Sequence, residues 1–156
     1  MTAKECRAFL EEWPDLAFRD PKAGHEHALE GLARVRRLGE EPQLLARALT
    51  YLGSSHRLLG ELPEALEILR DRAVPIYRDR IVAVQDEADA RRRLGLVHRD
   101  FAALGESGHR EKAFDEIDHG FKIYVALDHQ EGMARCQLAR GSVFLRLDDY
   151  PQAWRP

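Results

Sequence analysis

Cysteine is scarce in this sequence of 156 residues. Cys6 and Cys136 are the only two, and they stand far apart without a CxxC motif. This scarcity argues against a scaffold held together by disulfides and against a zinc site built on cysteines. Two reduced thiols buried in helices are the simpler interpretation, and with it we expect a cytoplasmic protein.

Long apolar runs are also missing. No stretch approaches the 18 or so uncharged apolar residues of a membrane span, so we expect no membrane partner. The first residues, MTAKECRAFLEEW, carry Lys4, Glu5 and Arg7 where a secretory signal peptide needs an apolar segment. We therefore expect no signal peptide.

Aromatic residues make up only 8% of the chain, whereas charged residues make up 33%. That balance favours helices with ion-paired outer faces over a β-sandwich. The net charge of -3 does not suit a general nucleic-acid binder. The run Arg91-Arg92-Arg93 does not change this, because three consecutive helical residues spread over about 200° of the surface. We expect no nucleic-acid partner.

Helical periodicity runs through the chain, and no strand-like alternation persists, so the sequence predicts an all-α fold. Prolines at 21, 42 and 63 fit first helical positions, and glycines at 39, 60 and 105 fit helix ends. We predict one domain over 1–156, with an N-terminal helix or cap at 1–20 and a lone helix at 21–39. Helix pairs follow at 42–79, 85–127 and 130–156, the last of them incomplete.

Three prolines mark expected interruptions or starts. A capping box at Thr2 and Glu5 begins a first helix that includes Trp13, and Pro14 should stop or kink it. Pro75 lies far inside the fourth helix and should kink it or end it early. The segment 80–84 fits either a helix or a short extended link. Pro151 is expected to begin an eighth helix.

An internal repeat decides the fold class. Three segments share one pattern: YLGSSHRLLGELPEAL (51–66), RLGLVHRDFAALGESGHREKAF (93–114) and ARGSVFLRLDDYPQAW (139–154). Glycine inside a helix costs about 1 kcal/mol relative to alanine, so a glycine at the same position of each copy predicts close helix–helix contact there. Each copy has that glycine in its first helix (Gly53, Gly95, Gly141) and an alanine early in its second (Ala65, Ala113, Ala153).

These segments resemble tetratricopeptide repeats, in the longer, roughly 40-residue form seen in bacterial regulatory proteins. The resemblance covers about residues 21–156. It implies antiparallel helix pairs stacked as a right-handed α-solenoid, acting as a scaffold for protein–protein or peptide interaction rather than as an enzyme, with no cofactor. The residues that carry the resemblance are Leu52, Gly53, Gly60, Ala65, Leu69, Leu94, Gly95, Gly141, Phe144, Tyr150 and Ala153.

The third repeat lacks most of its second helix, and no polar capping helix follows it. Two explanations stay open. The sequence is a piece of a longer chain, or the open C-terminal end is completed by a partner or by a second copy, which would make a homodimer.

Partner contacts in tetratricopeptide repeats come from the first helix of each pair, which lines a concave groove. The resemblance therefore implies a partner-binding groove on these helices. Its predicted residues are Arg47, Thr50, Ser54, Arg57, Arg92, Arg99, Arg135 and Arg146, and the same helix positions also hold Leu58, Asp89, Leu96, Asp100, Leu138, Ser142 and Leu145.

Six of these residues are arginines and two are aspartates. Because arginine binds carboxylates in a bidentate way, an acidic or C-terminal-carboxylate peptide is the partner we expect. The competing interpretation is that these arginines pair with neighbouring glutamates on a solvated face. A regulatory domain that senses a small molecule or a signalling peptide is the alternative function.

The histidines are candidates for a metal or a catalytic site. His56 and His98 occupy the same repeat position, where packing between helices competes with a shared ligand site. His25 and His27 are two residues apart and so should face different ways. No catalytic motif accompanies them, and we expect neither an enzyme nor a metal site.

Overall fold

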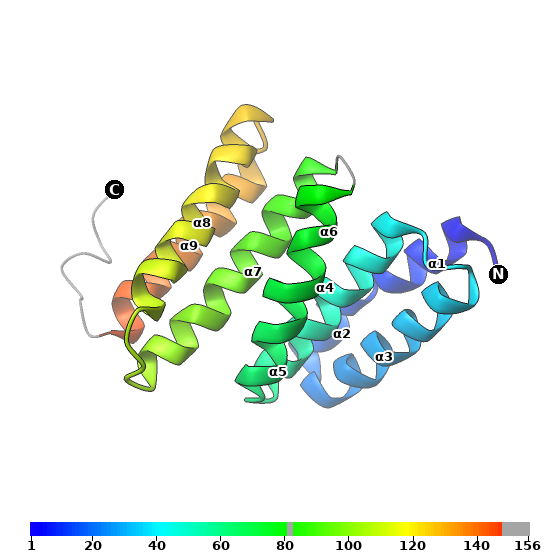
Figure 1. The fold of residues 1–156 in the computed structure, drawn as a ribbon, viewed down its shortest axis with the longest axis horizontal. Coiled ribbons are helices and arrows are strands. Elements are labelled where there is room, and N and C mark those ends of the chain that lie inside the picture. Colours follow the sequence, from blue (N-terminus) through cyan, green and yellow to red (C-terminus); the bar gives the residue numbers. More distant parts are fainter. Residues whose placement is uncertain (81–82, 148–156) are drawn as a thin grey trace. The chain divides into compact units, whose positions relative to one another are not determined.

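The chain is all-helical, and no strand occurs among the residues that the computed structural model describes, 1–80 and 83–147. The helices form two compact units, Met1–Ala83 and Val84–Pro156 (Figure 1). The division falls in the segment 80–84, which the sequence left open between a helix and a link. The grouping of 1–156 as one domain stays a prediction.

Side-chain caps mark the starts of three helices in the first unit. Thr2 Oγ1 accepts a hydrogen bond from the backbone N–H of Glu5 at 3.1 Å, as the capping box predicts. Asp20 and Glu41 cap the next long helices in the same way. The elements are α1 (Ala3–Leu10), α2 (Trp13–Arg19), α3 (Pro21–Arg37), α4 (Pro42–Leu58), α5 (Leu62–Leu66), the π-helix η1 (Glu67–Ala73) and α6 (Val74–Asp79).

The prediction for Pro14 was wrong. The first helix ends at Leu10, and Trp13 and Pro14 open α2 instead of closing α1. The physical reason is positional, because a proline in the first turn of a helix removes an N–H that has no partner within the helix. Trp13 is thereby turned into the core of the unit, where only 3% of it is exposed.

Pro75 perturbs its helix without ending it. The chain forms a π-turn over Glu67–Ala73, and the backbone N–H of Val74 bonds to the carbonyl of Leu69, five residues earlier. The α-helix then resumes through Pro75 to Asp79. The wider turn is one of the known local adjustments of a helix, and here it directly precedes the residue that cannot donate a backbone hydrogen bond.

The second unit consists of α7 (Val84–Ala103), α8 (His109–Ala126) and α9 (Gln130–Arg146). Gly105 and Gly108 take positive φ angles of 87° and 83° in the turn between α7 and α8. The last helix begins at Gln130 and is capped by His129, whose Nδ1 accepts from the N–H of Gly132 at 2.9 Å. The core of this unit contains Ala88, Ala113, Ile117, Tyr124, Cys136, Ala139 and Val143.

Two of the three repeat glycines, Gly53 and Gly95, lie at close helix contacts, as predicted. A Cβ built on Gly53 would lie 2.7 Å from Leu69 Cγ, and one on Gly95 would lie 2.6 Å from Ile117 Cγ1. In both copies the contacting residue stands four positions after the repeat alanine (Ala65 or Ala113). For the third copy, Ala153 and the helix expected from Pro151 lie outside the described residues.

Candidate interaction surfaces

The predicted groove residues fall into the two units. Arg47, Thr50, Ser54 and Arg57 lie on α4 in the first unit, whereas Arg92, Arg99, Arg135 and Arg146 lie on α7 and α9 in the second. The structure therefore gives the surroundings of each set separately.

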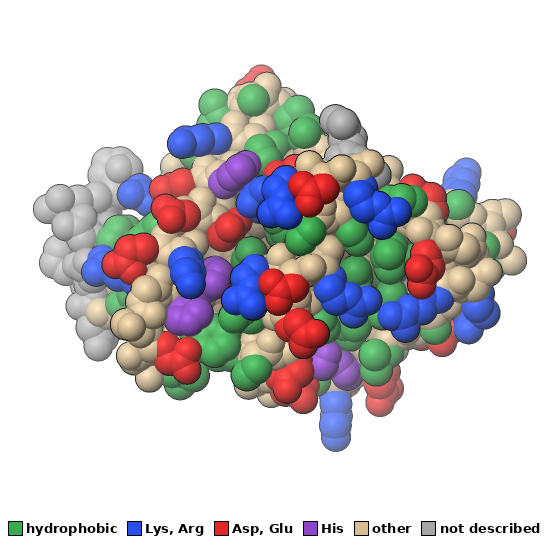
Figure 2. Space-filling model, in the orientation of Figure 1, with side chains coloured by type: hydrophobic (Ala, Val, Ile, Leu, Met, Phe, Trp, Pro, Cys, Tyr) green, Lys and Arg blue, Asp and Glu red, His purple; other side chains and the backbone are tan. Residues whose placement is uncertain are grey.

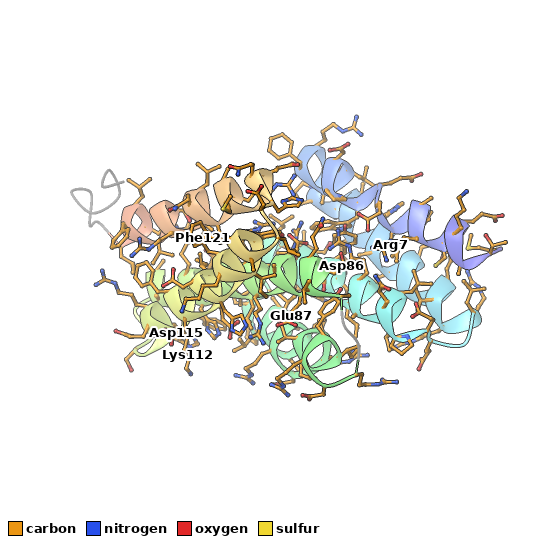
Figure 3. All side chains as sticks on the ribbon, turned by 90° about the horizontal axis from the view of Figure 1, so that it is seen from above. Arg7, Asp86, Glu87, Lys112, Asp115 and Phe121 are labelled. Carbon is orange, nitrogen blue, oxygen red and sulfur yellow. The ribbon has the colours of Figure 1, made fainter. Side chains whose placement is uncertain are left out.

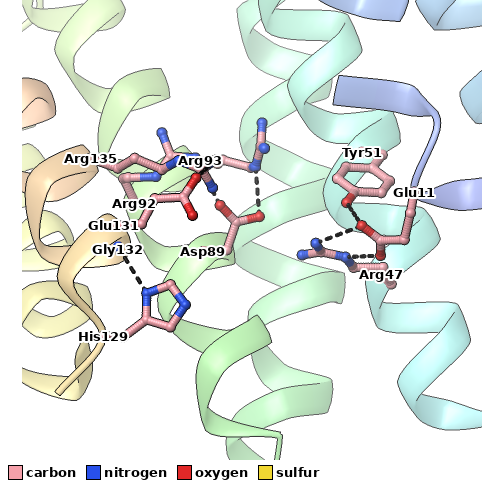
Figure 4. A network of polar contacts seen from close by, with 10 residues as sticks. All are labelled: Glu11, Arg47, Tyr51, Asp89, Arg92, Arg93, His129, Glu131, Gly132 and Arg135. Atoms are coloured by element: carbon pink, nitrogen blue, oxygen red, sulfur yellow. Dashed lines mark hydrogen bonds and ion pairs between the residues drawn. The ribbon is translucent and has the colours of Figure 1, made fainter. Parts of the chain in front are cut away.

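Arg47 is held inside the first unit by an acidic and an aromatic residue. Its guanidinium donates to both carboxylate oxygens of Glu11, at 2.9 and 3.2 Å, and lies over the Tyr51 ring (Figure 4). The Tyr51 hydroxyl donates to the same carboxylate at 2.7 Å. Trp13 stacks on Tyr51 and donates from Nε1 to Ser55 Oγ at 2.7 Å. This network ties α4 to the chain around the α1–α2 turn.

The remaining α4 positions offer little surface. Thr50 is fully buried, and its hydroxyl donates to the Ala46 carbonyl at 2.7 Å. Ser54 is 1% exposed. Neither side chain is open to a partner in this conformation. Arg57 is half-buried in the last turn of α4, where a positive charge suits the helix dipole.

Glu11 gives the first unit an acid-sensitive contact. Burial alone would raise its pKa, but the hydrogen bonds from Arg47 and Tyr51 outweigh burial and hold the pKa below the usual 4.5. A carboxyl whose pKa is lowered by folding stabilises the folded state above its unfolded pKa. That stabilisation is lost as the pH falls through the lowered folded value.

We therefore expect the free energy of unfolding to fall as the pH drops below about 4.5, and Glu11→Gln to flatten this decline. Urea unfolding monitored by circular dichroism between neutral and acidic pH measures both slopes. Glu12→Gln is the matched control, because it removes the neighbouring carboxylate, whose side chain is 68% exposed and lies 3.9 Å from His27 Nε2. Equal slopes for wild type and Glu11→Gln would contradict the assignment.

In the second unit, the α7 arginines pair with aspartates of the same helix. Arg92 and Arg93 donate to the two oxygens of Asp89, at 2.8 and 2.9 Å (Figure 4). Arg99 donates to Asp100 at 2.9 Å. These arginines thus pair within the chain, as the competing interpretation holds. Their partners are aspartates rather than the expected glutamates, and the Arg92–Asp89 and Arg99–Asp100 pairs are largely buried rather than on a solvated face.

Contacts from Arg99 and Arg146 join α7 to α9. Arg99 donates from Nη1 to Ser142 Oγ at 2.9 Å, and Ser142 in turn donates to the Ala139 carbonyl at 2.6 Å. Arg146 reaches the Asp100 carboxylate at 3.3 Å, although its side chain remains 53% exposed. Asp100 therefore takes hydrogen bonds from two of the predicted arginines.

α9 presents the most open part of the predicted surface. Arg135, Leu138, Ser142, Leu145 and Arg146 recur at helical spacing and share one side of the helix. Leu138 is 75% exposed, and Leu145 is 39% exposed. Arg135 pairs with Glu131 one turn earlier, and its side chain remains 52% exposed. We call these five residues the α9 face.

The histidines pair with one another across helices. The rings of His25 and His56 meet edge to face at 4.7 Å, and His98 and His109 approach to 2.8 Å between their Nδ1 atoms. His27 turns elsewhere, with Nε2 2.6 Å from the Phe9 carbonyl. Burial and the neighbouring His56 lower the pKa of His25. These contacts are packing between helices. Within 1–80 and 83–147, no three His, Cys, Asp or Glu side chains are placed to hold a metal ion.

Two members of the network around Arg47 were not predicted from the sequence. They are Glu11 and Trp13, which was predicted only as part of the first helix. The spacing could not reveal that His25 and His109 are the ring partners of His56 and His98, because each lies on a different helix. Burial also raises the pKa of Cys136 to about 11, so its thiol stays protonated at neutral pH.

Charges of both signs are interspersed on the face drawn in Figure 2, where Lys and Arg alternate with Asp and Glu. None of the helices within the described residues combines the length and apolarity needed to span a bilayer. Comparison of the chain with protein-family models found no match, and comparison with curated proteins found none.

Proposed function

We propose that this chain is an interaction module, built as a tetratricopeptide-like α-solenoid, that binds an acidic peptide segment on the α9 face. The observation that carries the proposal is the exposure of Leu138 and Leu145 on the same side of α9 as Arg135 and Arg146. Exposed apolar side chains rimmed by arginine are typical of surfaces that bind another protein.

The helix contacts support the repeat architecture. Gly53 and Gly95 each receive a branched side chain from the following helix, at matching positions of the two copies. Gly39, Gly60 and Gly105 take positive φ angles directly after helices, as glycines that end helices do.

The ion pairs that these arginines form within the chain indicate how strongly a peptide carboxylate would bind. Arg146 and Arg99 both contact Asp100, so a carboxylate from a peptide would exchange with an internal one rather than meet free cations. Such exchange favours moderate affinity with strong dependence on salt. The leucines of the α9 face would supply the part of the affinity that salt does not weaken.

The test is binding of a fluorescent peptide in which glutamates flank two leucines, measured by polarisation at low salt. We expect Arg135→Glu/Arg146→Glu to weaken binding at least about tenfold, because reversing two charges replaces attraction by repulsion. We also expect the affinity of wild type to fall as salt rises from about 50 to 200 mM.

The matched control is Arg36→Glu/Arg72→Glu, which changes the net charge equally at exposed positions of the first unit. If both double variants lose affinity to the same extent, the effect is one of net charge and the α9 face is not the site. Absence of saturable binding to wild type would reject the acidic-peptide proposal itself.

A further inference from the structure

α9 carries a second exposed surface, on the side where the earlier repeats are covered. The first helices of the copies align through Gly53, Gly95 and Gly141. Four residues before the glycine, Leu49 is 1% exposed and Arg91 is 8% exposed, whereas the equivalent Gln137 is exposed. One residue before it, Leu52 and Leu94 are buried, whereas the Arg140 side chain is 49% exposed.

A second helix is what covers this side in the earlier copies. Leu69 and Ile68 lie on Gly53, and Ile117 of α8 lies on Gly95. Each covering helix places an alanine one turn before the branched residue, so that the two backbones approach closely. The repeat therefore specifies the kind of element that fits against Gly141, namely an amphipathic helix with an alanine followed four residues later by Leu or Ile.

This second exposed surface of α9, around Gln137 and Arg140, continues onto side chains of α8. The rings of Phe114 and Phe144 meet at 5.0 Å between centroids. The guanidinium groups of Arg110 and Arg140 each lie within 6 Å of both rings. Phe121 is half-buried farther along α8 (Figure 3). We call this surface the α8–α9 docking face; it comprises Arg110, Phe114, Phe121, Gln137, Arg140 and Phe144.

A small pocket opens within this face. It has a volume of about 230 Å³ and is lined from both helices by Ile117, Asp118, Phe121, Cys136, Gln137 and Arg140, so polar and charged side chains share its lining with apolar ones. Pockets for drug-sized molecules start at roughly 300 Å³. The pocket is therefore better suited to one side chain of a docked helix than to a separate drug-sized ligand.

We propose that the α8–α9 docking face binds an amphipathic helix of a partner protein. The helix places Leu or Ile against Gly141, inserts one side chain into the pocket beside Phe121, and directs acidic residues toward Arg110 and Arg140. This is a second binding surface, distinct from the α9 face, and it does not depend on the proposed acidic-peptide site.

The composition of the face favours a separate partner over a segment of this chain. Where a helix of the same chain covers the site, the residue before the glycine is leucine, as in Leu52 and Leu94. In α9 it is Arg140, beside exposed aromatic rings. Arg and aromatic residues are enriched in interfaces between proteins, whereas permanently covered surfaces are more apolar. Arg140 lies 3.9 Å from the Asp118 carboxylate, so an acidic residue of the partner would compete with this internal pair.

The probe is a labelled synthetic peptide of residues 109–126, HREKAFDEIDHGFKIYVA. This segment covers Gly95 in the chain and carries the Ala113–Ile117 spacing that the face requires. We expect saturable binding to the full chain by fluorescence polarisation. We expect Gly141→Leu to weaken it at least tenfold by blocking close approach, and Arg140→Glu to weaken it severalfold. A peptide with Ile117→Asp should not bind.

Arg135→Glu/Arg146→Glu is the control, because it disables the α9 face and should leave the binding of this peptide unchanged. Failure of the peptide to bind, or equal binding by Gly141→Leu, overturns the proposal.

Two further outcomes would show that the docked helix does not come from a partner protein. If wild type sediments as a dimer and Gly141→Leu as a monomer, the occupant is a second copy. If Gly141→Leu lowers the melting temperature, the occupant is a segment of this chain, since glycine to leucine otherwise favours the helix.

Discussion

Replacing Trp13 by alanine is expected to lower the free energy of unfolding by about 3–5 kcal/mol, in the upper range for single substitutions. Trp13 is 3% exposed, its ring stacks on Tyr51 at 4.8 Å, and its Nε1 donates to the buried Ser55 hydroxyl. Truncation removes the burial and the stacking and leaves Ser55 without this donor. Urea unfolding followed by circular dichroism gives the change directly.

Trp13→Phe separates the contribution of the buried ring from that of the hydrogen bond to Ser55. It keeps an aromatic ring against Tyr51 and removes the hydrogen bond to Ser55, so we expect a loss of about 1–2 kcal/mol. Phe18→Ala is the control for removing an aromatic residue from α2, because Phe18 is 90% exposed. If Trp13→Ala were no more damaging than Phe18→Ala, Trp13 would not hold α2 in the core.

The second large effect is expected from Gly95→Leu, which should destabilise the chain by about 3 kcal/mol. A Cβ at this position would lie 2.6 Å from Ile117 Cγ1 and 3.0 Å from the Ala113 carbonyl oxygen. The Ile117 side chain could move, but the carbonyl belongs to the backbone of α8, so the two helices must separate. Calorimetry of the full chain measures the change.

Ala126→Leu is the matched control, because Ala126 is exposed near the end of α8. It adds the same kind of side chain without a facing backbone, and we expect a change within about 0.5 kcal/mol. A Gly95→Leu variant as stable as this control would show that α7 and α8 can be repacked at no cost. The repeat glycine would then have no packing role.

Local chemistry made much of the fold predictable. Thr2 and Asp20 carry side chains that cap helices, and Pro21 and Pro42 fit the first turn, so these helix starts could be predicted from neighbouring residues alone. Gly53 and Gly95 could be predicted to lie at close contacts because a mid-helix glycine is otherwise unfavourable. Pro14 misled the prediction, since the same residue type ends one helix and begins another.

The candidate site was less predictable, because the spacing of residues along the sequence does not reveal which distant residues contact each other. Nothing near Arg47 in the sequence indicates Glu11, 36 residues earlier, as its partner. The same holds for Arg99 and Ser142, 43 residues apart. The repeat position correctly placed Arg135, Arg146 and the α9 leucines on one side of a helix, since helical periodicity fixes that geometry.

The wide turn before Pro75 has a consequence for how this segment tolerates changes in length. A π-turn holds one residue more than an α-turn, and each residue of an α-helix advances the side chains by about 100°. Deleting one residue from Glu67–Ala73 would therefore relax the wide turn into an ordinary one and keep Ile76 and Tyr77 pointing inward. Val84–Ala103 is an α-helix without a wide turn. Deleting one of its residues would rotate the buried side chains on one side of the deletion away from their neighbours. The segment before Pro75 should therefore tolerate the deletion of one residue without loss of the buried core.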